Sequence, residues 1–254
     1  MAFPTTVQLK QGMEKVETSS QKHKLGTRGV TSDGRIFYYA ENSGTAIDHG
    51  GYLVDGIAAV AAHDMDVAAT AAHSVGDTTI SIEVPTTDLT ANQYKDGYLY
   101  FNDGPGQGET YMVKSHPAHD ASDDNTVIIT IDEEDGFVHA ISAGASAIQC
   151  GLAANPYLSS TIYQHDAIVG APLGWSVSDV ASGSFGWMCV KGLTMALCNG
   201  AVTIGLPVVA ANDTLDGAVE ALDSDDDAEG TIVGYMGNTV GADTEYSLIK
   251  ANIQ

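Results

Sequence analysis

The stretch FGWMCVKGLTMALCNGAVTI, residues 185–204, decides the fold class of this chain. It contains two runs of strand-forming residues, 185–190 and 193–198. Asn199-Gly200 follows, the pair most typical of a tight β-hairpin turn, and we predict that it leads into a third strand over 201–204. Side chains alternate along a strand, so three apolar residues share one face of the second run: Leu193, Met195 and Leu197.

Short runs of the same character recur through the rest of the chain, separated by Gly, Asp, Asn and Pro. Strands this short with turns about every 8 to 12 residues are typical of closed β-structures. The Ala-rich stretch 56–73 fits a helix by composition, but its second half alternates like a strand, and we favour a strand there. The other predicted strands cover 35–40, 79–84, 98–101, 109–114, 126–131, 218–222, 231–236 and 246–253. We therefore predict an all-β protein.

The length of 254 residues fits one large all-β domain or two small ones, and we favour two small barrels or sandwiches preceded by an extended arm. The predicted ranges are 1–34 for the basic arm, 35–160 for a β-rich domain and 161–254 for a small β-barrel domain. The arm is polar with little apolar periodicity, so we expect a neighbouring subunit to order it. A disordered leader is the alternative.

The formal net charge is −23, yet six of the ten Lys and Arg residues lie in the first 35 positions. A body this acidic repels phosphate backbones, which argues against nucleic-acid binding. No run reaches the roughly 18 apolar residues of a membrane span, and the start lacks the apolar stretch of a secretion signal, so we expect neither export by that route nor a membrane partner. The candidate contact residues of the arm are Lys10, Lys15, Lys22, Lys24, Arg28 and Arg35.

The residues with catalytic or ligand chemistry form no recognisable catalytic site. Cys150, Cys189 and Cys198 are an odd set without a C-x-x-C pair, which predicts buried thiols rather than disulfides or a zinc site. There is no Gly-x-Ser-x-Gly elbow, and no histidine accompanies a cysteine in a known setting. We therefore predict a protein that is not an enzyme, with no catalytic, cofactor-binding or metal residues and no cofactor.

Three further segments and one set of aromatic residues can each be interpreted as functional or as structural. His116-Pro117-Ala118-His119-Asp120 contains metal-ligand types, but Pro117 disturbs any regular geometry, and we favour a solvated loop. Asp223–Gly230 alternates carboxylates like a calcium loop, although Ala228 stands where glycine is needed. The glycine-rich 104–108 precedes a strand instead of a helix, so we predict a hairpin loop and not a phosphate site. Three aromatic residues are interpreted as core or subunit interface instead of an exposed sugar-binding surface: Trp175, Phe185 and Trp187.

Two sets of segments, one in each half of the chain, resemble phage proteins. The first resembles a segment of virion structural proteins of marine and environmental tailed phages: Thr90–Leu99, Asn102–Gly104, Gly106–Tyr111 and Lys114–Ala118. The second is similar to the small β-barrel of phage head decoration, or cement, proteins: Leu197–Ala201, Gly217–Glu220, Thr231–Gly234 and Glu245–Ile249.

The resemblance implies a non-enzymatic protein that binds the outside of an assembled phage head and staples neighbouring capsomers. Its implied partners are the major capsid protein and further copies of itself, a homotrimer being favoured. Its implied location is the exterior of the virion, after assembly in the host cytoplasm. The alternatives are a tail, collar or fibre component of the virion, and a carbohydrate- or calcium-dependent binding module.

Overall fold

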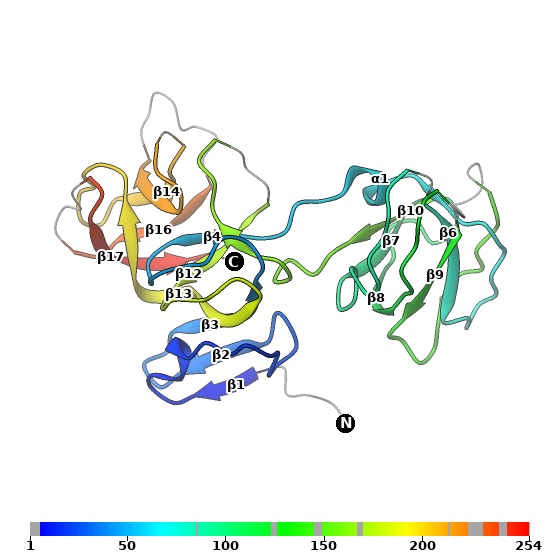
Figure 1. Cartoon of the computed structure of the whole chain (residues 1–254), viewed down its shortest axis with the longest axis horizontal. Coiled ribbons are helices and arrows are strands. Elements are labelled where there is room, and N and C mark those ends of the chain that lie inside the picture. Colours follow the sequence, from blue (N-terminus) through cyan, green and yellow to red (C-terminus); the bar gives the residue numbers. More distant parts are fainter. Residues whose placement is uncertain are drawn as a thin grey trace. The chain divides into compact units, whose positions relative to one another are not determined.

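Figure 1 shows the computed structural model, which describes residues 6–84, 86–122, 126–144, 149–166, 170–212, 214–222, 231–238 and 243–253. Nearly all of the regular structure in these ranges is β-strand, so the predicted all-β class is confirmed. No helix within the same ranges has the length and apolar character needed to cross a membrane.

The chain divides into two compact units in which the second is an insertion in the first. Unit 1 consists of Met1–Ala58 and Pro156–Gln254, and unit 2 consists of Ala59–Asn155. This division differs from the predicted ranges 1–34, 35–160 and 161–254. The reason is long-range pairing: strands after residue 156 pair with strands before residue 56, and a local pattern of alternation carries no information about such partners.

Unit 1 is built around one long bent strand, β13, Ser184–Cys198. The other elements of this unit are β1 (Thr6–Leu9), the 3-10 helix η1 (Met13–Lys15), β2 (Arg28–Thr31), β3 (Ile36–Asn42), β4 (Leu53–Asp55), β11 (Thr161–Ile162), β12 (Pro172–Ser176), β14 (Pro207–Ala210), β15 (Ala218–Ala221), β16 (Ile232–Met236) and β17 (Tyr246–Asn252). The first half of β13 pairs with β3 and β12, and the second half pairs with β17 and, at its end, with β15.

The second half of β13 closes a five-stranded barrel in the order β13-β15-β14-β16-β17 (Figure 1). The β13–β15 pair is parallel, while the other neighbours in the ring are antiparallel. Small and β-branched side chains fill the interior, which suits the narrow lumen of a barrel with few strands. The buried cluster includes Ala196, Cys198, Val208, Val219, Val233 and Ile249.

The predictions for residues 185–204 are confirmed in part. The two predicted runs, 185–190 and 193–198, are one strand, because the backbone bends through a register shift between Cys189 and Lys191 and does not break. The chain bends at Asn199-Gly200, where Gly200 has a φ of 81°, but this bend does not form the predicted hairpin. The strand predicted for 201–204 is wrong: the end of β13 pairs with β15, so the segment after the turn has no partner beside it.

The segment predicted to be an extended arm is folded onto the sheet of its own chain. β1 pairs in parallel with β2, and Leu9 is buried in a cluster with the rings of Phe37 and Trp187. The imidazole of His23 packs against the rings of Tyr39 and Trp187, with centroids 5.1 and 5.3 Å apart. The arm has few apolar residues, as the sequence indicates, but the aromatic residues of β3 and β13 supply the surface it lacks. Residues 6–34 therefore do not require a neighbouring subunit to order them.

Unit 2 is a six-stranded sheet in the order β5-β10-β7-β8-β9-β6 that almost closes into a barrel. An isolated bridge between Ala69 and Ile82 joins its two edges. The elements are α1 (Ala61–Asp64), β5 (Val67–Ala68), β6 (Thr79–Glu83), β7 (Tyr98–Asp103), β8 (Thr110–Ser115), β9 (Thr126–Ile131) and β10 (Gln149–Ala153). Residues 104–108 join β7 to β8, so the predicted hairpin loop is confirmed. The Ala-rich stretch 56–73 contains a one-turn helix and only a two-residue strand.

Candidate functional site

The outer surface of the unit 1 barrel carries a mixed cationic and apolar patch on β13 and β17. These strands pair antiparallel with Leu193 opposite Lys250 and Met195 opposite Leu248. Leu193 is 51% exposed and Met195 is 43% exposed, so this side of the pair faces solvent. We name the patch the β13–β17 face, and it consists of Lys191, Leu193, Met195, Leu248, Lys250 and Asn252.

The prediction that Leu193, Met195 and Leu197 share a face of the strand agrees with this register, but they differ in burial. Leu197 is covered by Tyr52 and Tyr246, whereas the side chains of Leu193 and Met195 are exposed. Large apolar side chains side by side on an outer barrel surface are typical of contact sites.

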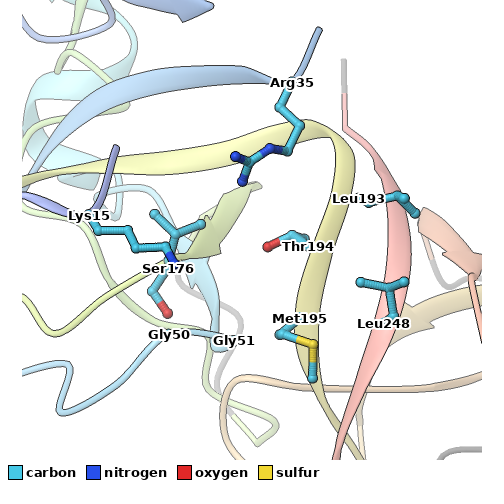
Figure 2. Close-up of a pocket in the computed structure, with 10 residues that line it drawn as sticks. Lys15, Arg35, Gly50, Gly51, Ser176, Leu193, Thr194, Met195 and Leu248 are labelled. Carbon is cyan, nitrogen blue, oxygen red and sulfur yellow. The ribbon is translucent and has the colours of Figure 1, made fainter. Parts of the chain in front are cut away.

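A pocket of about 270 Å³ adjoins the β13–β17 face and shares three of its residues, Leu193, Met195 and Leu248. Figure 2 shows Lys15 reaching in from the side opposite to Leu193 and Leu248, with Arg35 above. Gly50, Gly51 and Ser176 complete that end of the pocket. The pocket therefore combines carbon-rich walls with two basic side chains.

The Arg35 guanidinium is held in place by two carboxylates. Its Nη2 donates to Glu14 Oε1 at 3.1 Å, and its Nε donates to Asp33 Oδ2 at 2.8 Å. Glu14 is only 1% exposed, and its other oxygen accepts the Gly12 N–H at 2.7 Å. The Thr31 hydroxyl and Arg35 together lower the pKa of Asp33 to about 2, so that this carboxylate stays ionised at all ordinary pH values. The charge of Arg35 is thus compensated within the chain.

Lys15 is the free cation of the pocket. It ends η1, its side chain is exposed, and no ion pair involves it within the described residues. Glu14, its neighbour in sequence, is buried and forms the ion pair with Arg35. The 3-10 turn therefore separates a buried acidic side chain from an exposed basic one, and only the basic one faces the pocket.

The six basic residues predicted as a contact arm are divided by the structure. Lys15 and Arg35 meet at the pocket. The other four lie elsewhere on the folded segment: Lys10 follows β1, Lys22 and Lys24 precede β2, and Arg28 begins β2. Their predicted role in contacts with other proteins stays a prediction.

Lys191 and Lys250 were not predicted as contact residues, because the predicted contact residues were chosen by their closeness along the chain. A signal was present: Lys191, Leu193 and Met195 alternate with residues whose side chains point to the opposite side of β13. The identity of the strand beside them, which brings in Lys250, is a long-range fact that no local pattern shows.

His116 is a structural residue, which makes it a poor metal ligand. It is buried at 4% exposure; its Nε2 accepts the Tyr94 N–H at 3.0 Å, and its Nδ1 donates to the Pro117 carbonyl at 2.8 Å. Both ring nitrogens are therefore occupied. His119 Nε2 donates to the Val84 carbonyl at 3.1 Å. The predicted solvated loop is wrong for His116, because the hydrogen bond to Tyr94 draws the ring into unit 2.

His63 is a second buried imidazole of unit 2 that sequence spacing did not single out. Its Nδ1 accepts the Tyr94 hydroxyl at 2.7 Å, and its Nε2 donates to the Thr87 carbonyl at 3.2 Å. Burial lowers the pKa of both His63 and His116, so both rings are neutral near pH 7. Tyr94 thus links two neutral imidazoles.

A short chain of polar groups in unit 1 has the order carboxylate, imidazole, hydroxyl. His49 Nδ1 contacts the Asp48 carboxylate, and the Tyr246 hydroxyl bonds to His49 Nε2 at 2.7 Å. Burial raises the pKa of Tyr246 above its usual value, so the hydroxyl keeps its proton. The hydroxyl therefore serves as a hydrogen-bond donor and not as a nucleophile.

One group of His and Asp side chains among the described residues lies close enough together to be a candidate metal site. Ligand atoms of His165, Asp166 and Asp216 lie within 4.8 Å of one another. However, the ring Nδ1 and the backbone N–H of His165 both bond to Asp216 Oδ1, at 2.7 and 3.1 Å. These two hydrogen bonds between residues distant in sequence account for the closeness of His165 and Asp216 without a metal.

Asp55 on β4 is the most unusual titratable group in the described chain. It is fully buried, and neither carboxylate oxygen has a hydrogen-bond partner. Burial raises its pKa to about 7. Trp175 Nε1 on the paired strand β12 is also buried without a partner.

The cysteines and tryptophans are core residues. Burial raises the pKa of Cys150 to about 12 and that of Cys189 to about 11, so neither thiol forms the reactive thiolate at neutral pH. Cys198 is also buried and free. Trp175 and Trp187 are 0% and 5% exposed, which agrees with the predicted core role and removes them from any sugar-binding surface.

Two acidic segments remain, and the first of them is the candidate calcium loop. Asp223–Gly230 lies outside the described residues. Asp132–Asp135 is a turn after β9, in which Asp132 lies 3.8 Å from Lys114 Nζ. That turn forms an ordinary surface ion pair.

Known proteins offer no relative for comparison: no family model, no curated protein and no solved structure matches the chain.

Proposed function

We propose that this chain is a non-enzymatic head decoration protein of a tailed phage, which attaches to the outer surface of the capsid through the β13–β17 face. The resemblance in sequence supports the class of protein. The β13–β17 face is the observation that carries the mode of attachment, because it sets exposed apolar side chains among lysines on a chain whose net charge is −23.

The charge distribution favours attachment by one face. Copies of a strongly acidic body repel each other and any acidic surface, and within a Debye length of about 8 Å that repulsion is felt at contact. Lys191 and Lys250 offset it locally, while Leu193 and Met195 contribute apolar area that is removed from water on docking. A partner with acidic groups around an apolar patch fits this face.

The test uses heads assembled from the major capsid protein encoded with this chain. The face variant Lys191→Gln/Lys250→Gln is compared with Lys95→Gln/Lys114→Gln, which removes the same charge from exposed lysines elsewhere. Co-sedimentation at rising protein concentration gives the affinity. We expect a loss of at least tenfold for the face variant, since each exposed charge contributes up to about 1 kcal/mol, and less than twofold for the control.

Two outcomes would contradict the proposal. Equal losses for both variants would mean that net charge alone drives the association. Binding of the unmodified protein to isolated tails but not to heads would favour the tail, collar or fibre alternative.

Deletion of the first 34 residues is not a clean test of the arm. That deletion removes β1 and β2 and exposes the aromatic cluster around Tyr39 and Trp187. Lost binding would then report misfolding, so point substitutions are required.

A further inference from the structure

We infer that the pocket between Lys15 and Leu248 binds a carboxylate carried on a short apolar body. This inference deepens the proposed function and rests on it only for the natural source of the ligand, which would be an acidic segment of the capsid partner. The pocket itself defines the ligand chemistry, through Lys15, which has no ion pair among the described residues, and through its carbon-rich walls.

The polar end of the pocket selects a single negative charge. Lys15 is exposed and has no ion pair within the described residues, so its ammonium is available to an incoming anion. Arg35 contributes less, because Glu14 and Asp33 already compensate it. Those two carboxylates also oppose a second negative charge nearby, which disfavours a phosphate dianion relative to a carboxylate.

Ser176 does not compete for the anion. Its Oγ accepts the Tyr52 N–H at 3.0 Å and donates to the His49 carbonyl at 3.2 Å. Because the hydroxyl proton is used within the chain, the ligand meets Lys15 as its main donor.

The opposite end of the pocket is apolar. Leu193, Met195 and Leu248 come from β13 and β17 (Figure 2). Methionine adapts its shape to different ligands because its side chain is unbranched and flexible. Gly51 in the pocket wall cannot be replaced freely: it has a φ of 102°, and a Cβ there would lie 2.6 Å from the Tyr246 ring.

The volume limits the ligand to a small one. At about 30 Å³ for each water-sized group, the 270 Å³ of the pocket accommodates about nine non-hydrogen atoms. This is close to an acidic side chain with one apolar neighbour, or to a fatty acid with seven or eight carbons in total. Octanoate is therefore a suitable probe.

The experiment follows the methyl signals of the protein labelled with ¹³C-methyl methionine, titrated with octanoate below its micelle concentration. Met195→Leu assigns the Met195 signal. We expect octanoate to move this signal saturably, while 1-octanol and octylammonium bind at least tenfold more weakly. Lys15→Gln should weaken octanoate about tenfold without affecting octanol, and Lys22→Gln should change neither.

Equal affinity for octanoate and octanol, an unchanged Lys15→Gln variant, or shifts spread over all methionines would each overturn the inference. Head binding is measured separately on the same proteins. Saturable octanoate binding with no head attachment would remove the proposed function but leave the pocket, whereas normal head attachment without octanoate binding would remove only the pocket.

Discussion

Asp55 shows how one residue ties the stability of unit 1 to pH. Its pKa is about 7 in the folded chain and close to 3.8 when unfolded. The folded state therefore holds a proton that the unfolded state releases, and stability falls as pH rises from about 4 to about 7. Above pH 7 the full cost of burying an ionised carboxylate is present.

Asp55→Asn should stabilise unit 1 by about 2 kcal/mol at pH 8, since it removes the charge but keeps the shape. Near pH 4 the carboxyl is neutral in the folded state and about half protonated in the unfolded state, so little of the loss is present and the variant should match the unmodified protein within about 0.5 kcal/mol. Denaturant unfolding followed by tryptophan fluorescence measures this, because both tryptophans lie in unit 1. The same gain at both pH values would contradict the account.

The buried imidazoles of unit 2 have the opposite pH dependence. Their pKa values lie below 6.5 when folded, so the unfolded state binds more protons in acid. The contribution of these two neutral rings to the stability of unit 2 is fully present above pH 6.5, and it decreases as the pH falls below that value. Protonation of His116 also replaces the acceptor of the Tyr94 N–H with a donor.

We therefore expect the Tyr94 amide to exchange with solvent at least tenfold faster at pH 5 than at pH 7, after correction for the intrinsic rate. NMR hydrogen exchange measures this. His116→Gln, whose side-chain oxygen can still accept the N–H, should show a weaker dependence. Protection that does not change between the two pH values would show that the rings are not coupled to opening.

At the scale of elements, the bend in β13 depends on Gly192. This residue has a φ of 106°, and a Cβ there would lie 2.7 Å from Arg35 Cγ. Gly192→Ala should therefore cost about 2 kcal/mol, from backbone strain and displacement of Arg35. Gly183→Ala, with a φ of 75° and open space around it, is the control for strain alone, and denaturant unfolding compares the two. Equal costs would mean that the contact with Arg35 contributes nothing.

The same scale shows what could be predicted from sequence. Strands such as 79–84 and 126–131 were predictable because alternation and bounding turns are local properties. The merging of 185–190 with 193–198 was not, because Gly192 indicates a break unless the partners that hold both halves are known. The pocket could not be predicted from the sequence for the same reason. Leu248 lies at the pocket with Lys15 because β17 pairs with β13, and this pairing is a long-range contact.

At the scale of the whole chain, the two units have separate cores and opposite pH responses. Calorimetry at pH 5 should show two transitions, with unit 2 melting at the lower temperature, because acid weakens unit 2 and spares Asp55. Tryptophan fluorescence should follow only the upper transition. A single transition seen by both methods would mean that the units unfold together.

The insertion of unit 2 also determines the order in which the two units can fold during synthesis. As the ribosome releases the chain, residues 59–155 form a continuous stretch that finds all its strand partners within itself. The strands β3 and β4 emerge before this stretch but must wait, because their partners β13 and β12 are made only after it. Unit 2 can therefore fold before unit 1, and during that delay the edge of β3 is exposed to chaperones and to other nascent chains.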